Sequence, residues 1–276
     1  MGITRREALS ALALGGGAAL AAGALVGAVG PAAAAAAGKS GKSSGKPATA
    51  APGGAGSAAA GTPGAGAAAA LASLGKHAPV PLPFDPKKLR GLSDRLLVSH
   101  WENNYGGAVK NLNKVEEQLA AVNKDTPGFL VAGLKERELS FTNSVILHEL
   151  YFGNLGGSGK PAGTVAGALG DAFGSFARFE ELLRATGGSL GGGSGWAVLD
   201  MELPSSALRV YWAGNHTQAV AFGAPLLVLD MYEHAYALDY GAAAAKYIDA
   251  FFENLHWEEI DRRYARALEA AKALRA

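Results

Sequence analysis

One short stretch constrains the fold of this chain more than any other: an apolar run that ends in a carboxylate. Residues 225–229 read Pro-Leu-Leu-Val-Leu, short and unbroken enough for a buried strand, and Asp230 follows directly. A carboxylate at the end of a core strand must be paired or metal-bound, because an isolated buried charge is unfavourable. His234 lies four residues later, in a segment of helical composition, where it can converge with Asp230. This donor pair suits a first-row transition metal, although the same spacing is common on solvated helix faces.

The chain changes character close to His77. Earlier residues are mostly Ala, Gly, Ser and Pro, whereas nearly all aromatic residues lie beyond Pro83. Such a composition buries too little apolar surface to offset its ordering entropy, so we predict a disordered low-complexity linker over residues 38–77. About two hundred residues remain, which is enough for one sizeable core.

Charge and cysteine content exclude two classes of function. Six basic residues and one acidic residue precede His77, which leaves 19 basic and 23 acidic residues in the remainder, a net charge of −4. We therefore expect no nucleic-acid partner, because nucleic-acid-binding domains carry a basic face. The chain has no cysteine, which removes thiolate catalysis, disulfides and Cys-based metal sites. Any metal must be held by His, Asp or Glu.

The N-terminus predicts export. Arg5 and Arg6 precede a mildly apolar, Ala/Gly-rich segment and a run of alanines, the pattern of a twin-arginine signal peptide over residues 1–37. Ala8 stands where such signals usually carry an aromatic residue. The alternative is a membrane anchor, but the segment is poorly apolar for a transmembrane helix. We expect cleavage, no stable membrane anchor afterwards, and a protein exported to the periplasm, cell envelope or medium.

The remaining chain predicts an α+β fold with helices first and a small sheet later. Residues 78–160 are expected to form an N-terminal helical hairpin domain, with one long helix capped by Ser93 and running to about residue 122, and another over 134–152. Residues 161–276 are expected to form a C-terminal α+β domain with flanking helices. In it we predict a helix at 164–185, three antiparallel strands at 196–201, 208–212 and 225–229, and helices at 240–254 and 257–276.

Three histidines stand out beside Asp230. His100 and His148 lie on the two predicted hairpin helices, and His234 follows the last strand. A lone histidine on an apolar helix face is usually a core residue that is hydrogen-bonded to a neighbour. A set of three is harder to explain in that way. His216, in the polar connection before the last strand, is a further candidate.

Taken together, these residues resemble the iron/manganese superoxide dismutase family over residues 82–264. The most specific match is the stretch from Asp230 to Tyr236, which is similar to the signature Asp-x-Trp-Glu-His-Ala-Tyr, with Tyr232 in place of tryptophan. The other matching residues are His100, Val109-Lys-Asn-Leu-Asn113, His148, Phe173-Gly-Ser-Phe176, Gly193-Ser-Gly-Trp196 and Asn254-Leu-His-Trp257.

The resemblance implies a mononuclear site with one Mn or Fe ion per subunit and superoxide as the substrate. Its ligands would be His100, His148, Asp230 and His234, with a solvent molecule as the fifth ligand. Two superoxide ions and two protons would become dioxygen and hydrogen peroxide as the metal alternates between its trivalent and divalent states. His216 would be the catalytic histidine that hydrogen-bonds the bound solvent, as in the histidine-type members of the family. The plainer alternative is a solvated loop histidine.

The resemblance also implies a homodimer, and at three positions the sequence departs from the family pattern. Glu233 matches a glutamate that hydrogen-bonds the equivalent of His234 in the other subunit. Asn104, Ala108 and Ala237 stand where the family commonly has a channel-lining histidine and two tyrosines.

These departures leave three readings open. The leading one is a dismutase, and the alternative is a metal protein of the same fold whose activity is altered or lost. A cell-envelope protein that has lost its metal is the third. Tyr105 and Tyr236 are the candidates to refill the space at the channel.

Overall fold

The structure is a computed structural model, and it describes residues 74–276. The predicted signal peptide, residues 1–37, and nearly all of the predicted linker lie outside the described residues. Among the residues from 74 onward, no helix combines the length and apolar character needed to cross a membrane.

The first long helix is built from three consecutive segments. These are α2 (Asp94–Ser99), a π-helical segment η2 (His100–Tyr105) and α3 (Gly106–Ala120), preceded by the short η1 (Pro86–Lys88). Ser93 caps the helix as predicted, because its hydroxyl accepts a hydrogen bond from the Leu96 backbone N–H at 3.0 Å.

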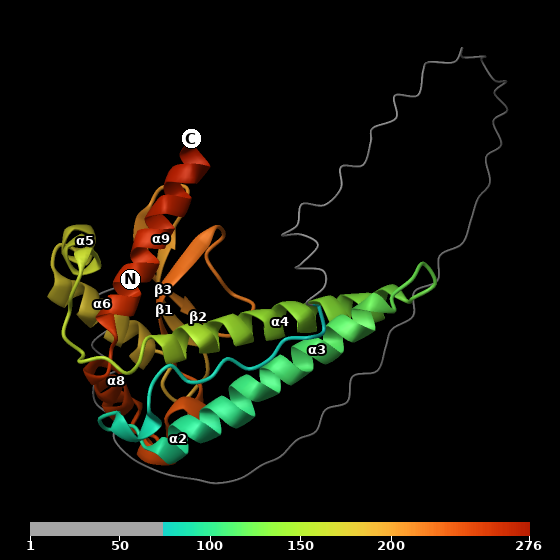
Figure 1. Cartoon of the computed structure of the whole chain (residues 1–276), viewed down its shortest axis with the longest axis horizontal. Helices are drawn as coiled ribbons and strands as arrows, with labels where there is room; N and C mark the ends of the chain where they lie inside the picture. The colour runs from blue at the N-terminus through green and yellow to red at the C-terminus, as the bar shows by residue number, and fades with distance from the viewer. Residues whose placement is uncertain (1–73) are drawn as a thin grey trace, which may run out of the picture. The chain divides into compact units, whose positions relative to one another are not determined.

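The second helix, α4 (Gly128–Gly153), runs beside α3 and forms a hairpin with it (Figure 1). It begins earlier than residue 134, where the sequence had placed its start. Gly128 and Gly133 have low helix propensity and disguise the first turns, whereas Pro127 immediately before the helix favours a helix start.

The predicted helix at 164–185 is wrong in one respect: it is two helices. α5 (Thr164–Phe173) ends at Gly174, whose φ of 83° lies in the left-handed region that glycine adopts without strain. α6 (Phe176–Gly188) begins directly afterwards, with the Ser175 hydroxyl accepting a hydrogen bond from the Arg178 N–H at 3.0 Å. A C-cap glycine followed by an N-cap serine therefore turns the chain within two residues.

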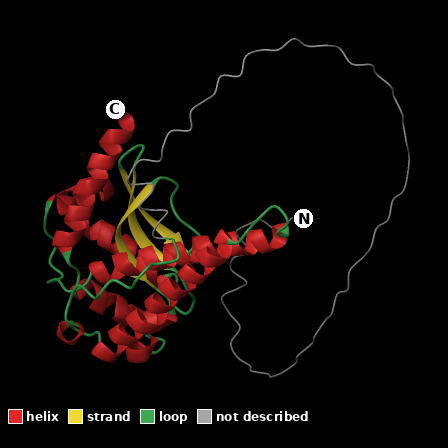
Figure 2. Cartoon of the chain, turned by 45° about the vertical axis from the view of Figure 1, so that its right-hand side comes forward, coloured by secondary structure: helices red, strands yellow, loops and turns green. Residues whose placement is uncertain are grey.

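The predicted three-stranded antiparallel sheet is confirmed. Its strands are β1 (Trp196–Glu202), β2 (Ala207–Ala213) and β3 (Gly223–Asp230), in the order β2-β1-β3. Helices lie beside this sheet (Figure 2), with α4 packed against β3 and α6 against β1 and β2. Trp196, at the start of the central strand, pairs in register with Asp230 at the end of β3. The sheet thus places an indole beside the buried carboxylate.

The chain after β3 is helical but interrupted. The segments are η3 (Glu233–Ala235), α7 (Ala237–Tyr240), α8 (Ala244–Glu253) and α9 (Trp257–Arg275). α8 begins later than the predicted residue 240, because Gly241 takes a φ of 54° and ends α7. Both halves of the chain contribute to one buried core, which includes Leu97 from α2 and Leu229 from β3.

Asn154, just after α4, joins the hairpin to the sheet. Its side chain is fully buried. Its Nδ2 donates to the Val228 carbonyl at 2.7 Å, and its Oδ1 accepts from Arg263 Nη1 of α9 at 2.7 Å. His148 lies less than two turns before this junction and Asp230 two residues beyond Val228, so the junction sets how these two residues face each other.

The last residues of the predicted linker belong to the folded structure. His77 Nε2 lies 2.9 and 3.1 Å from the two carboxylate oxygens of Glu116 on α3. The Asn113 amide pairs with the backbone of His77, at 2.8 Å to its N–H and 2.9 Å to its carbonyl. Composition did not reveal this contact, because one histidine among alanines and glycines finds its partners only through the fold.

Asp200 is a buried carboxylate on β1, at the other end of that strand from Trp196. Its Oδ1 has no hydrogen-bond partner among the described residues. The carboxylate packs so closely on Gly223 that a Cβ there would lie 2.5 Å from Oδ1. Burial raises the pKa of Asp200 to about 7, although the Ala224 backbone N–H opposes this by donating a hydrogen bond.

Asp200 should therefore make the protein less stable as the pH rises. Because its folded-state pKa of about 7 exceeds the ordinary 3.8, the folded state is favoured at low pH, and this contribution is lost between about pH 4 and 7. We expect Asp200→Asn to raise the free energy of unfolding at pH 8 by about 1–3 kcal/mol, and by much less at pH 5. Denaturant titrations at both pH values measure this. The exposed Asp171→Asn is the control, and an equal change at both pH values would contradict the prediction.

Candidate metal centre

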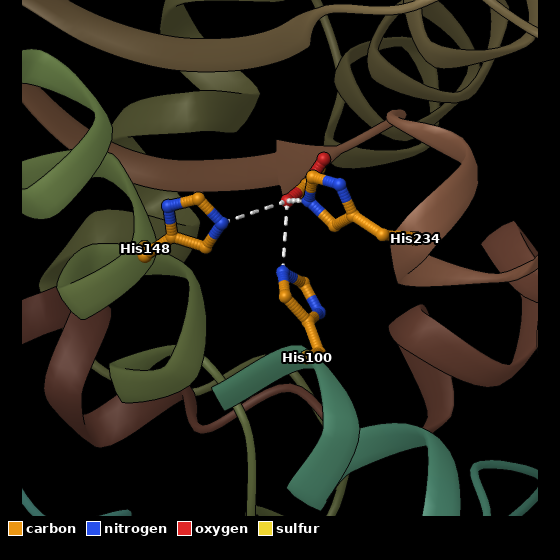
Figure 3. Close-up of side chains that lie close together, drawn as sticks. His100, His148 and His234 are labelled. Atoms are coloured by element: carbon orange, nitrogen blue, oxygen red, sulfur yellow. Dashed lines mark hydrogen bonds and ion pairs between the residues drawn. The ribbon is translucent and has the colours of Figure 1, made fainter. Parts of the chain in front are cut away.

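Four of the predicted site residues meet at one point (Figure 3). Each of His100, His148, Asp230 and His234 offers one ligand atom, and these atoms all lie within 4.8 Å of one another. Asp230 Oδ2 lies 3.2 Å from His100 Nε2, 3.2 Å from His234 Nε2 and 3.7 Å from His148 Nε2. The structure therefore brings together three imidazoles and one carboxylate, as the sequence predicted.

Each residue of the cluster is positioned by a different element. His100 opens the π-helical segment η2, and such local widenings of a helix are frequent at functional sites. His148 lies on α4, Asp230 ends β3, and His234 is in η3. The chain turns tightly after β3, with the Tyr232 N–H donating to Asp230 Oδ1 at 2.9 Å. This turn, and not a helix face, brings His234 back over Asp230.

Buried nitrogens without partners show that the cluster fits a metal ion. Within residues 74–276, His100 Nε2 and His148 Nε2 are buried and make no hydrogen bond. The 3.2 Å approach of His100 Nε2 to Asp230 is too poorly directed to count as one. Unsatisfied buried polar atoms are unfavourable, and a cation among them satisfies all of them at once.

The protonation states suit a cation. Burial lowers the pKa of His100 and lowers that of His148 to about 3, so both imidazoles are neutral. Burial alone would raise the pKa of Asp230, but His234 and His100 outweigh it and hold that pKa far below its usual range. Neutral imidazole and ionised carboxylate are the forms that bind metals.

Ser144 fixes the tautomer of His148. Its backbone carbonyl accepts a hydrogen bond from His148 Nδ1 at 2.7 Å. The proton therefore sits on Nδ1, and the lone pair of Nε2 faces the cluster. Asp230 is held from behind as well, because the Tyr247 hydroxyl donates to its backbone carbonyl at 2.7 Å.

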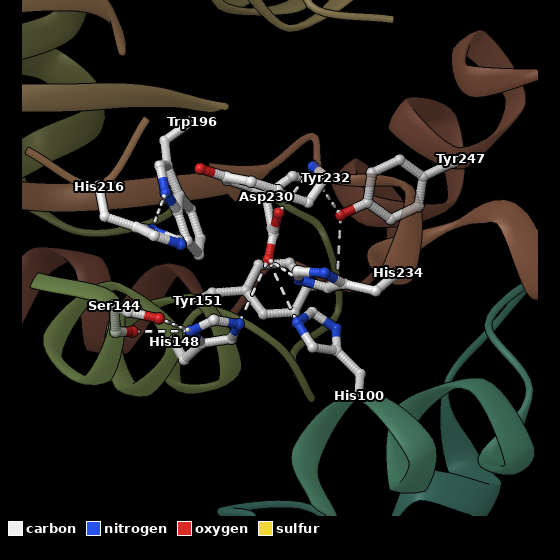
Figure 4. Close-up of polar contacts among 10 residues, drawn as sticks. All are labelled: His100, Ser144, His148, Tyr151, Trp196, His216, Asp230, Tyr232, His234 and Tyr247. Carbon is white, nitrogen blue, oxygen red and sulfur yellow. Dashed lines mark hydrogen bonds and ion pairs between the residues drawn. The ribbon is translucent and has the colours of Figure 1, made fainter. Parts of the chain in front are cut away.

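His216 lies beside the four residues but does not belong to their set (Figure 4). The Trp196 indole Nε1–H donates to His216 Nδ1 at 3.0 Å. An indole can only donate, so Nδ1 is the acceptor and the neutral ring carries its proton on Nε2. Burial lowers the pKa of His216, which favours this neutral form.

The position of Tyr232 in the site was not predicted. The sequence showed only that Tyr232 replaces the tryptophan of the signature stretch. Its ring is stacked between two imidazoles, 4.9 Å from His216 and 5.3 Å from His234, each at an interplanar angle of 12°. Its place in the signature stretch was the signal that pointed to it. Tyr247 and Asn143, which also contact this region, had no comparable signal in the sequence.

A pocket of about 240 Å³ opens onto the cluster. It is lined by polar uncharged, small and aromatic residues: Asn103, Asn104, Gly107, Ala108, Asn111, Phe141, Ser144, His148, His216 and His234. Two of the three substituted positions, Asn104 and Ala108, are therefore in its wall. The third, Ala237, lines an adjacent depression that also contains Asn104, Glu233 and His234.

Tyr105 and Tyr236, the candidates to fill the space at the channel, point elsewhere. The Tyr105 hydroxyl accepts from the Val80 N–H and donates to Glu149, both at 2.7 Å. The Tyr236 hydroxyl accepts from the Gly192 N–H at 3.4 Å. Neither lines the pocket at Ala108, so the space there stays open.

Known proteins match about two thirds of this chain. Residues 161–263 match the family of iron/manganese superoxide dismutases, C-terminal domain. The Fe superoxide dismutase of Cupriavidus metallidurans is 48% identical over 189 residues, which is 68% of this chain and 96% of that protein. The Fe superoxide dismutase of Aquifex pyrophilus is 34% identical, over 69% of this chain and 92% of that protein. The protein named superoxide dismutase [Mn] 2 of Haloferax volcanii is 33% identical, over 68% of this chain and 96% of that protein.

The level of identity and the near-complete coverage of these relatives agree with the geometry of the cluster. The chain belongs to the iron/manganese superoxide dismutase family.

Proposed function

We propose that this protein dismutates superoxide with one iron or manganese ion per subunit, held by His100, His148, Asp230 and His234. The observation that carries the proposal is the convergence of these four side chains around buried nitrogens that no described residue satisfies. The relatives support it, since they are named as Fe or Mn superoxide dismutases. A mixed nitrogen and oxygen donor set without sulfur suits either metal.

The side chains of the site have separate tasks. A bound iron or manganese ion supplies one-electron redox chemistry between its trivalent and divalent states. Asp230 contributes one negative charge that offsets part of the charge of the ion, and the neutral imidazoles complete the set. His216 keeps its proton on Nε2, at the pocket, because Trp196 occupies Nδ1. It is thereby the group placed to donate a hydrogen bond or a proton there.

The pocket also suits an anionic substrate. Its described lining contains amides, a hydroxyl and imidazoles, and no carboxylate. N–H and O–H donors stabilise a small anion, and the absence of negative side chains avoids repulsion.

A second candidate function rests on the open space at Ala108. A pocket of about 240 Å³ is far larger than a diatomic substrate needs. A metal protein with this pocket could admit larger anions, and its dismutation would then be slow or lost. The same four ligands serve both candidates, so the distinction lies in the pocket wall.

We also propose a homodimer in which Glu233 approaches His234 of the other subunit. Glu233 is exposed and forms no ion pair with any described residue, and it lines a depression of about 410 Å³ with His234 and Leu238. The Nε2 atom of His234 faces Asp230, which leaves Nδ1 for an acceptor outside the subunit. Sedimentation analysis that returns the mass of a single subunit would refute the dimer.

The twin-arginine signal over residues 1–37 and export of the protein are further proposals. Their support is the Arg5-Arg6 pair and the Ala/Gly-rich segment that follows it. The N-terminal residue of the protein recovered outside the cytoplasm tests them, since an intact Met1 would contradict cleavage.

Removing one cluster histidine should remove the metal. His148→Ala should lower metal affinity by more than ~100-fold, because even changes to the partners of a ligand cost ~10–100-fold. Metal content by mass spectrometry should fall from about one ion per chain to almost none, and superoxide decay should slow to the rate of free ions. His256→Ala, which removes a partly exposed histidine outside the cluster, is the matched control. A variant that keeps its metal and its rate would show that the cluster is not the site.

Ala108→Tyr separates the two candidate functions. If the protein is a dismutase in its natural form, superoxide decay per bound metal is already fast and changes by less than ~10-fold when the pocket is filled. Stopped-flow decay rates of both proteins, normalised to metal content, measure this. Activity that rises from near zero only in the variant would support the second candidate.

A further inference from the structure

His216 lies on an exposed connection between β2 and β3, yet its ring must be held in one orientation to serve the pocket. Most of its neighbours in that connection are exposed, including Asn215, Thr217 and Gln218. The hydrogen bonds within the connection are local. Gly214 N–H donates to Gln218 Oε1 at 2.5 Å, and Thr217 N–H donates to Asn215 Oδ1 at 2.8 Å. These bonds shape the turn but do not attach it to the rest of the protein.

Two described hydrogen bonds reach His216 from outside this connection. One is the Trp196 indole on the ring. The other comes from Asn143 on α4, whose Nδ2 donates to the His216 backbone carbonyl at 2.6 Å. The backbone is thus held from the hairpin and the ring from the sheet, while Tyr232 stacks on the ring face. Three elements far apart in the sequence therefore locate one imidazole.

Asn143 and Ser144 are adjacent on α4 and form hydrogen bonds with two different histidines. The Ser144 carbonyl holds Nδ1 of His148, and the Asn143 amide holds the backbone of His216. A single segment of helix therefore fixes both the lone pair that faces the cluster and the ring that faces the pocket. Without the amide, the His216 backbone would be free to move away from Trp196, and the ring would lose the donor that selects its tautomer.

We propose that Asn143 is a positioning residue that holds His216 as its Nε2–H tautomer at the pocket. The consequence for catalysis rests on the proposed dismutase function, but the positioning itself does not. Because the contact is a single side-chain donor, replacing Asn143 with the isosteric aspartate removes the N–H group with little change in volume.

The test compares Asn143→Asp and Asn143→Ala with the natural protein, all as the full chain. Gln118→Ala is the control, because Gln118 is an exposed amide on α3 that lies outside the pocket at the cluster. In the zinc-loaded proteins, long-range proton–nitrogen NMR reports the His216 tautomer, and hydrogen exchange reports the backbone at 215–217. In the iron-loaded proteins, superoxide decay per bound metal is measured.

We expect the natural protein and Gln118→Ala to show one His216 tautomer, protonated at Nε2, and the same superoxide decay per bound metal. Both Asn143 variants should show a mixture of tautomers and about two- to tenfold faster exchange at 215–217, the effect of losing one hydrogen bond. Superoxide decay per bound metal should fall by about tenfold or more. A folded Asn143→Asp or Asn143→Ala protein with one unchanged tautomer and unchanged exchange would overturn the proposal. If the tautomer changes while the decay rate does not, positioning by Asn143 stands and the proposed catalytic role of His216 is the part that fails.

Discussion

The fully buried carboxylate of Asp230 is the constraint on which the rest of this structure depends. A charge in that position is tolerated because three imidazoles face it, and two of them, His100 and His148, have Nε2 atoms without a hydrogen-bond partner among the described residues. The folded protein thus contains buried imidazole nitrogens that no described residue satisfies and that a metal ion would satisfy. Metal binding and stability of the core are therefore linked in this protein.

That constraint requires the hairpin and the sheet to be held in a fixed relation, since two imidazoles come from one and the carboxylate from the other. Asn154 provides the connection by bonding to β3 and to Arg263 at the same time. Asn143 provides a second connection at the other side of the site. Side-chain amides suit this task because they can donate and accept hydrogen bonds without adding charge.

The site combines a buried His/Asp cluster with an open pocket beside it. The four converging side chains could hold a metal ion, whereas the wall of the adjacent pocket has an amide at Asn104 and a small side chain at Ala108. Electrostatics and ligand geometry argue for dismutation, while the open wall bears on which anions can enter. The cluster and the pocket wall are physically separable. The cluster depends on α4 and the end of β3, whereas Asn104 and Ala108 of the wall lie on the long helix that begins at α2.

The sequence alone predicted most of the element types and the sheet, because hydrophobic periodicity and capping residues are local signals, and the family resemblance pointed to the four residues that converge. Ser93 capped its helix, and the apolar run before Asp230 became a buried strand. Only the tertiary structure decided which nitrogen of His216 carries the proton, where Tyr105 and Tyr236 point, and that Asn143 reaches His216. Those outcomes depend on contacts between residues 20 to 73 positions apart, and such distances in the chain leave no local pattern to read.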